Sequence, residues 1–207
     1  MSYGEFTLNK LENQFQLIII DQRELFPDIK SVNPSQLLRE TLTENIPLAL
    51  GIDTEKARSE LIVMPVLVEL RRLFNRQISL FSGREFNIDS SVGLNGTCDF
   101  IISHSPQQLS VKAPVFTAVE AKNDNIRSGI PQCIAEMLAA QKFNEQQNNY
   151  IPCIYGAVTT GSLWKFIKLE GTTVYIELKE HFIENIESLL GILYNIVATT
   201  RPNQSNT

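Results

Sequence analysis

The 207-residue chain has no long apolar run that would direct it into a membrane. Its most apolar segment, Leu61 to Leu70, is interrupted by Pro65 and Glu69 and is far shorter than the roughly 20 apolar residues that span a bilayer. The first residues show no basic leader followed by an apolar segment, so no secretion signal is expected. These absences predict a soluble, cytoplasmic protein that does not associate with membranes.

Cysteine and histidine are scarce. The three cysteines, Cys98, Cys133 and Cys153, are an odd number without C-x-x-C spacing, so neither a disulfide framework nor a zinc site is predicted. The two histidines, His104 and His181, have no second histidine at ligand spacing, and no G-x-S-x-G segment is present. We therefore assign neither histidine a role.

Positive charge is also in deficit, because 18 lysines and arginines stand against 23 acidic residues, a net charge of −5. Proteins that bind nucleic acid by neutralising phosphates with their own side chains usually have the opposite balance. A local basic groove, bound divalent ions or a partner subunit can supply the positive field that the net charge hides. The charge balance thus counts against nucleic-acid binding without excluding it.

Apolar periodicity predicts a single α/β domain in which helices flank a mixed sheet. We expect an extension over 1–50, a core over 53–178, a closing helix over 181–199 and a disordered tail over 201–207. Helices are predicted over 34–45, 53–74, 128–146 and 182–198, and residues 7–15 have mixed helical spacing. Strands are predicted over 15–20, 78–81, 85–88, 98–103, 115–121, 154–159, 164–169 and 173–178.

Proline and capping residues set the expected bounds of the early helices. Asn33 is the predicted cap of the first helix, with Pro34 at its first position and Pro47 just beyond its end. Asp53 is the predicted cap of the next helix, which Pro65 should kink or split.

Charged residues stand at the ends of two predicted buried strands, in Gly96-Thr-Cys-Asp99 and in Glu120-Ala-Lys122. Charges there must be paired, bind a metal or take part in chemistry, because their burial is costly. Residues two apart on a strand share a face, so Glu120 and Lys122 project together while Ala121 points away. Asp99, on a neighbouring strand, brings a second carboxylate close to Glu120.

Two neighbouring carboxylates repel each other unless a cation neutralises them. Carboxylate oxygens with room for waters suit Mg²⁺ or Mn²⁺. The structural alternative is a buried ion-pair cluster that fixes the strand register. The residues alone favour the metal site and leave this alternative open.

A family resemblance adds to this pattern. A helix with Glu60, strands with Gly96-x-x-Asp99 and Glu120-x-Lys122, and a helix beginning near Gln132 resemble the PD-(D/E)XK nuclease superfamily. The resemblance covers residues 60–169, and it implies a restriction-endonuclease-like three-layer core.

A second segment supports the same family. Thr159-Thr-Gly-Ser-Leu-Trp164 resembles the Thr-Asn-Gly-x-x-Trp segment in the N-terminal nuclease domains of type I restriction subunits. Thr160 stands where that segment usually has Asn.

The resemblance implies a Mg²⁺- or Mn²⁺-dependent nuclease, acting endo- or exonucleolytically on DNA. Asp99 and Glu120 would be metal ligands, and the main-chain carbonyl of Ala121 would add another. Glu60 would be the helix-borne acid that reaches the metal through water. Lys122 would be the catalytic lysine, which orients or deprotonates the attacking water or stabilises charge on the phosphate.

Two helix assignments have structural alternatives. Glu60 can be a surface residue that pairs with Lys56, and Glu55 competes for its role. Gln132, which we include among the candidate catalytic residues, lies four residues before Glu136 on one helical face. Gln132 would bind the substrate backbone or contact Lys122, or it would only face solvent.

Two further functional hypotheses remain at this stage. The chain could be an inactive nuclease fold kept as a binding module, as its acidic balance and lack of a basic run suggest. It could also be an accessory subunit of a DNA-processing complex, since no P-loop is present. A homodimer would suit an enzyme that cuts both strands.

Overall fold

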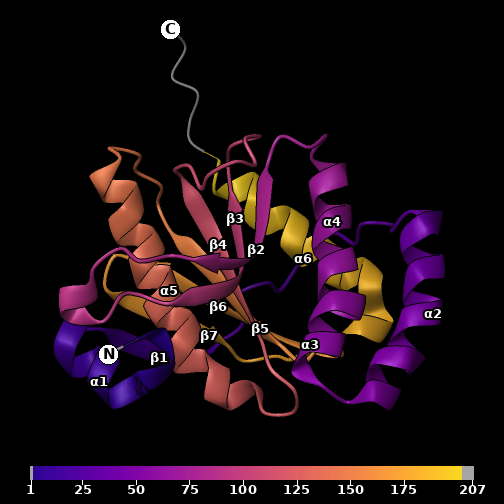
Figure 1. Ribbon diagram of the computed structural model, residues 1–207, viewed down its shortest axis with the longest axis horizontal. Coiled ribbons are helices and arrows are strands. Elements are labelled where there is room, and N and C mark those ends of the chain that lie inside the picture. Colours follow the sequence, from indigo (N-terminus) through magenta and orange to yellow (C-terminus); the bar gives the residue numbers. More distant parts are fainter. Residues whose placement is uncertain (1, 202–207) are drawn as a thin grey trace, which may run out of the picture.

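The computed structural model describes residues 2–201, in which a mixed eight-stranded sheet is flanked by helices (Figure 1). Apart from Arg201, the predicted disordered tail lies outside the described residues. The strands are β1 (Ile18–Arg23), β2 (Ser79–Glu85), β3 (Thr97–Ser103), β4 (Val115–Ala121), β5 (Ile154–Thr159), β6 (Leu163–Glu170), β7 (Thr173–Glu177) and β8 (His181–Phe182). The predicted α/β class is confirmed.

The helices are α1 (Leu8–Phe15), α2 (Gln36–Ile52), α3 (Glu55–Arg58), α4 (Met64–Leu73), α5 (Ile126–Gln146) and α6 (Ile186–Thr199). Four shorter turns are η1 (Tyr3–Glu5), η2 (Ser59–Val63), η3 (Ser90–Val92) and η4 (Ile183–Asn185); η2 is a π-helical turn and the others are 3-10 helices. None of the helices formed by residues 2–201 has the length and apolar character needed to cross a bilayer.

The sheet consists of two antiparallel meanders joined by one parallel pair. Its strand order is β1-β7-β6-β5-β4-β3-β2, with β8 beside β6. β2, β3 and β4 form one meander and β5, β6 and β7 the other. β4 and β5 run parallel, as the crossover through α5 requires, and β1 adds parallel to β7 at the edge.

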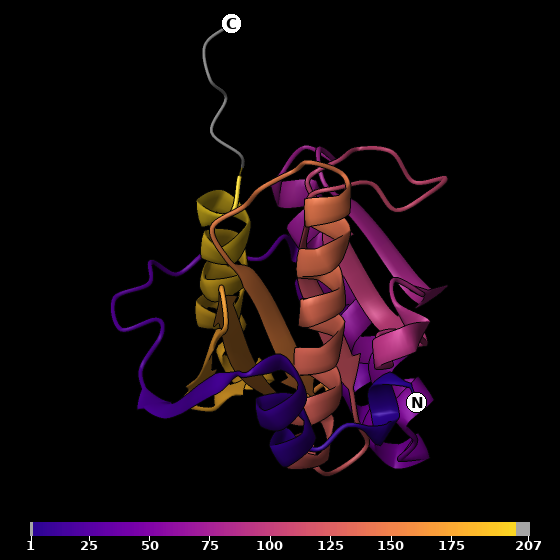
Figure 2. The same ribbon diagram turned by 90° about the vertical axis from the view of Figure 1, so that its left-hand side faces the viewer.

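Helices cover both faces of the sheet (Figures 1 and 2). α5 packs across β4 and β5 on one face, whereas α4 and α6 lie on the other and α2 packs outside α4. The central strands β4 and β5 are consequently buried at every position. Any charged side chain on these strands must therefore be neutralised inside the protein.

The predicted bounds around Pro47 are wrong. α2 begins after Ser35, whose hydroxyl accepts from the Leu38 N–H at 3.2 Å, and it runs through Pro47 to Ile52. A single proline removes one N–H donor, which a long packed helix tolerates. Asp53 is the left-handed residue that ends α2, and Thr54 is the cap that begins α3.

Pro65 does not break the predicted second long helix, because the turn before it widens. α3 continues through the π-helical η2 into α4, with Pro65 in the first turn of α4. Pro65 has no N–H for the carbonyl of Leu61, and the side-chain amide of Asn45 donates to that carbonyl instead, at 2.9 Å. A tertiary contact from α2 thus replaces the missing helical hydrogen bond.

Other bounds also differ from the predictions. The two strands predicted over 78–88 form the single strand β2, because Gly83 adopts φ of +59° while the pairing with β3 continues past it in the same register. Residues 15–17 end α1 and turn before β1 starts at Ile18. α5 begins at Ile126, two residues before the predicted start, because Asn125 is its cap, and α6 follows the turn η4.

The contact between α5 and β5 is close at Gly156. A Cβ atom there would lie 2.5 Å from the sulfur of Met137 and 2.6 Å from that of Cys133. A methyl group at this point forces α5 away from the sheet, and α5 carries part of the candidate site described below.

We therefore expect Gly156→Ala to lower the free energy of unfolding by roughly 1–3 kcal/mol, as overpacking does in other cores. Gly51→Ala is the matched control, because no atom lies within 4 Å of its added Cβ and it sits in α2. It should be neutral or stabilising by up to about 1 kcal/mol. Urea denaturation measures both, and equal effects would contradict the close packing.

Candidate active site

Asp99 and Glu120 come together at the end of the β3–β4 pair. Phe100 pairs with Val119, so Asp99 lies beside the last residues of β4. One carboxylate oxygen of Asp99 accepts from the Ala121 N–H at 2.8 Å. Burial raises the pKa of Asp99, although this hydrogen bond and the charge of Lys122 oppose the shift.

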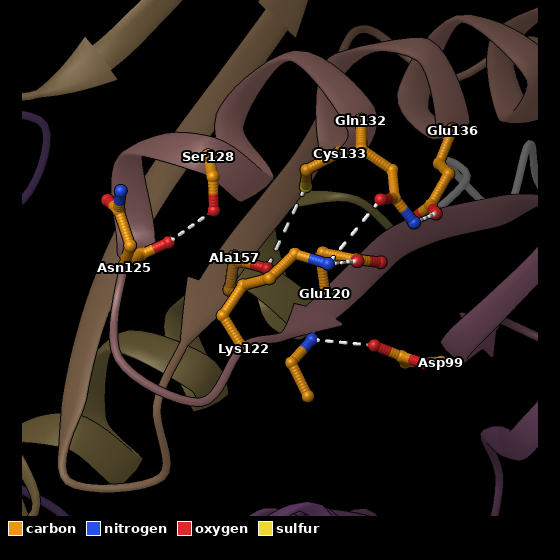
Figure 3. A network of polar contacts seen from close by, with 10 residues as sticks. Asp99, Glu120, Lys122, Asn125, Ser128, Gln132, Cys133, Glu136 and Ala157 are labelled. Carbon is orange, nitrogen blue, oxygen red and sulfur yellow. Dashed lines mark hydrogen bonds and ion pairs between the residues drawn. The ribbon is translucent and has the colours of Figure 1, made fainter. Parts of the chain in front are cut away.

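Glu120 and Lys122 project from the same face of the strand toward α5, as predicted (Figure 3). Glu120 is only 1% exposed, and Lys122 Nζ donates to its Oε1. Burial lowers the pKa of Lys122, but its hydrogen bond with Glu120 and the charges of Glu120, Glu55 and Asp99 outweigh burial, so that the pKa is raised. The anions hold the lysine in its ammonium form.

The stem of Lys122 is positioned by both backbone and packing. Its main-chain N–H donates to the Thr159 carbonyl at 2.8 Å, which extends the β4–β5 pairing by one residue. Gly129 of α5 lies against the stem, because a Cβ atom there would be 3.2 Å from Cγ and Cε of Lys122. The Lys122 side chain remains 20% exposed and is the more open member of the ion pair with Glu120.

α5 adds Gln132 and Glu136 to the cluster. The Gln132 carbonyl oxygen lies 3.5 Å from Lys122 Nζ, and its amide nitrogen donates to Glu136 Oε1 at 3.3 Å. Gln132 is thus directed at Lys122, which the sequence left as one of two alternatives. Glu136 is 1% exposed and lies inside the same cluster.

Glu120 and Glu136 are buried side by side, and the pKa of each carboxyl group is raised. Burial, followed by the charge of Glu120, raises the pKa of Glu136 well above its ordinary value. Burial, followed by the charge of Asp99, raises the pKa of Glu120 despite the opposing contact with Lys122. The two carboxyl groups interact with each other, and among the described residues no N–H or hydroxyl group donates to Oε2 of either residue.

The amino-terminal turn η1 covers the α5 side of the cluster. Tyr3 is buried, its hydroxyl donates to the Phe86 carbonyl, and its ring lies 2.9 Å from where a Cβ of Gly96 would be. Burial, with the nearby carboxyl group of Glu136, raises the pKa of Tyr3. No local sequence pattern predicted this contact, because it joins segments far apart in the chain.

The structure does not bring Glu60 to the other candidate residues. Its side chain is 64% exposed, pairs with Lys56 at 3.7 Å and lines a groove with Leu37 and Val68, between α2 and α4. Glu55 is the acid of this helical segment whose charge acts on Lys122. Glu55 and Glu60 thus have different surroundings, although they lie only five residues apart.

Arg58 is a cation near the site that the sequence analysis did not single out. Its guanidinium is largely buried and donates to Asp53 Oδ1 at 3.0 Å, to Asn123 Oδ1 at 3.2 Å and to the Thr160 carbonyl at 3.3 Å. These partners lie before α3, directly after Lys122 and after β5. Arg58 therefore ties together the three segments around the open side of Lys122.

The Thr159–Trp164 segment forms the tight turn between β5 and β6. The Thr159 hydroxyl donates to the Leu163 carbonyl at 2.8 Å and accepts from the Gly161 N–H at 2.9 Å. Trp164 is buried and its indole N–H donates to the Gly161 carbonyl at 3.0 Å. These contacts give the segment a structural role, with the Thr160 carbonyl left for Arg58.

The oxygen atoms available at this site are of the kind that a hard divalent cation binds. Carboxylate oxygens without donors on Glu120 and Glu136 are the ligands that Mg²⁺ and Mn²⁺ prefer. Ala121, the other predicted ligand, belongs to β4 next to Glu120. Within residues 2–201, however, no three or more His, Cys, Asp or Glu side chains form a group that could hold a metal ion as they stand.

Comparison of the chain with protein-family models, with curated proteins and with solved structures finds no match. The resemblance to the PD-(D/E)XK superfamily therefore remains a prediction from the sequence motifs. The geometry of the described residues is the remaining basis for inferring a function.

The buried carboxyl pair predicts a pH-dependent stability. Because the pKa values of Glu120 and Glu136 lie above the ordinary 4.5, the folded chain keeps protons that the unfolded chain releases above that pH. Stability from this pair is thus present at low pH and is lost as the pH rises through the raised pKa values. In metal-free buffer, Glu136→Gln should raise the free energy of unfolding at pH 8 by on the order of 1 kcal/mol and change it little at pH 5.

The measurement is urea denaturation of both proteins across pH 5 to 8. Glu145→Gln is the matched control, since Glu145 is exposed near the end of the same helix. A Glu136→Gln variant whose stability follows the wild-type pH profile would contradict the coupling between the two carboxyl groups.

Proposed function

We propose that this chain is a divalent-metal-dependent nuclease with a restriction-endonuclease-like core, and that it hydrolyses phosphodiester bonds in DNA. The convergence of Asp99, Glu120, Lys122 and Gln132 at the end of β4 is the observation that carries the proposal. A carboxylate pair with an adjacent ammonium suits phosphoryl transfer, in which catalysis consists largely of positioning and charge stabilisation.

Each residue has a distinct part in the proposed reaction. Asp99 and Glu120 hold the Mg²⁺ or Mn²⁺, with the Ala121 carbonyl as a further ligand. When bound, the metal supplies positive charge for a phosphate oxygen and lowers the pKa of a bound water. Lys122 donates hydrogen bonds from its ammonium to the attacking water or to a phosphate oxygen, and Gln132 keeps that ammonium in place.

Positive charge for the DNA backbone is limited around this site. Lys122 is only 20% exposed, the guanidinium of Arg58 is already bonded to Asp53, Asn123 and Thr160, and the chain as a whole is acidic. We therefore include in the proposal a second copy of the chain or a larger DNA-processing complex as the source of further phosphate contacts.

Substitution at the site tests the catalytic assignment. We expect Lys122→Ala and Asp99→Asn each to lower metal-dependent DNA cleavage by at least about 10²-fold, because each removes a charge that acts on the reacting phosphate. Lys168→Ala and Asp21→Asn are the controls, since Lys168 pairs with Glu170 on β6 and Asp21 is exposed on β1. Cleavage of labelled duplex DNA is the assay, and undiminished cutting by both site variants would refute the assignment.

A second candidate function is an inactive nuclease fold that serves as a binding module. The near-complete burial of Glu120 and Glu136 favours it, because a carboxyl pair that shares a proton needs no metal. Titration of the metal-free chain with Mn²⁺ separates the two functions. The nuclease should show a rise in melting temperature that saturates with Mn²⁺, as ligand linkage requires, whereas the inactive module should show none.

A further inference from the structure

We infer that Glu136 of α5, and not Glu60, supplies the helix-borne carboxylate of the metal site, so that a divalent ion lies between Glu120 and Glu136. This inference rests on the proposed function and deepens it, because it changes which side chain completes the donor set. Three observations carry it: the unpaired oxygens, the way each carboxylate is anchored, and the charge of the cluster.

The unpaired oxygens point to a missing ligand. Glu120 Oε2 and Glu136 Oε2 are both inaccessible to solvent, and among the described residues no N–H or hydroxyl group donates to either, so that the two carboxyl groups have only each other. Both side chains are 1% exposed, so that bulk water does not satisfy them. A buried carboxylate oxygen without a donor is costly, and a cation between two such oxygens removes the cost for both.

The other oxygen of each carboxylate is anchored. Lys122 donates to Glu120 Oε1, and Gln132 donates to Glu136 Oε1 at 3.3 Å. Gln132 also places its own carbonyl oxygen 3.5 Å from Lys122 Nζ, which links the two anchors. Each carboxylate is therefore oriented through Oε1 and offers Oε2, as is common for metal ligands that neighbouring side chains hold in place by hydrogen bonds.

The charge of the cluster matches a divalent ion. Asp99, Glu120 and Glu136 contribute three carboxylates, and Lys122 contributes one ammonium. With all four groups ionised, two negative charges remain to be neutralised. One divalent cation balances them and also meets the preference of Mg²⁺ and Mn²⁺ for oxygen ligands.

Glu60 is not oriented for this role. Its carboxylate pairs with Lys56 and lines the groove between α2 and α4. Glu136 lies across from Glu120 on the helix that covers β4 (Figure 3). In the described part of the chain, the helical acid with a hydrogen-bond link to Lys122 through Gln132 is Glu136.

Isothermal titration calorimetry with Mn²⁺ on the full chain, stripped of metal with a chelator, tests the inference without relying on activity. Glu136→Gln keeps the size of the side chain and its contact with Gln132 but removes a ligand charge. We expect its Mn²⁺ affinity to fall at least about tenfold. Glu145→Gln, on the same helix, should bind within about twofold of the wild type. Thermal unfolding without metal confirms that each variant is folded.

The possible outcomes separate the two proposals. Wild-type binding that Glu120→Gln abolishes but Glu136→Gln retains would overturn this inference and leave the proposed nuclease site standing. A loss of Mn²⁺ affinity in Glu60→Gln, with none in Glu136→Gln, would likewise overturn this inference and leave the proposed nuclease site standing. A wild-type chain that binds no Mn²⁺ overturns both, because Glu120 and Glu136 would then form only a shared-proton pair.

Discussion

Charge buried at the end of β4 is the constraint around which this part of the molecule is arranged. Glu120 stands on a strand with helices on both sides, and its one direct counter-charge is Lys122. Removing such a pair from water costs more than its attraction returns unless further groups assist. Gln132 accepts from the Lys122 ammonium and Gly129 lies close against the Lys122 stem, and these two contacts hold α5 against the sheet.

The predictable part of the site is the part that strand geometry determines. Asp99, Glu120 and Lys122 could be placed together because side chains alternate along strands and neighbouring strand ends meet. The sequence does not identify Glu136 as a metal ligand, because helical spacing alone cannot distinguish a buried acidic residue from an exposed one. Glu60 lies outside this cluster, and the sequence does not show which side of its helical segment faces the sheet.

The predicted sheet is largely correct, and the errors cluster at proline and glycine. Rules of local structure treat Pro47, Pro65 and Gly83 as breaks, yet each lies inside a continuous element. At Pro65 the reason is a hydrogen bond from Asn45 to the carbonyl of Leu61, which lies sixteen residues after Asn45. Such tertiary contacts decide whether a local break is tolerated, and they cannot be read from a short window of sequence.

The position of the first residues has a consequence for the order of folding. η1 contacts Phe86 and Asn95, and β1 pairs with β7 near the other end of the chain. During synthesis on the ribosome, β1 therefore emerges well before its partner β7, and η1 emerges well before Phe86 and Asn95. Non-local pairing of this kind slows folding and leaves an apolar strand unprotected in the meantime. The growing chain thus has a period in which Ile19, which packs against the core in the folded protein, is open to chaperones or to other nascent chains.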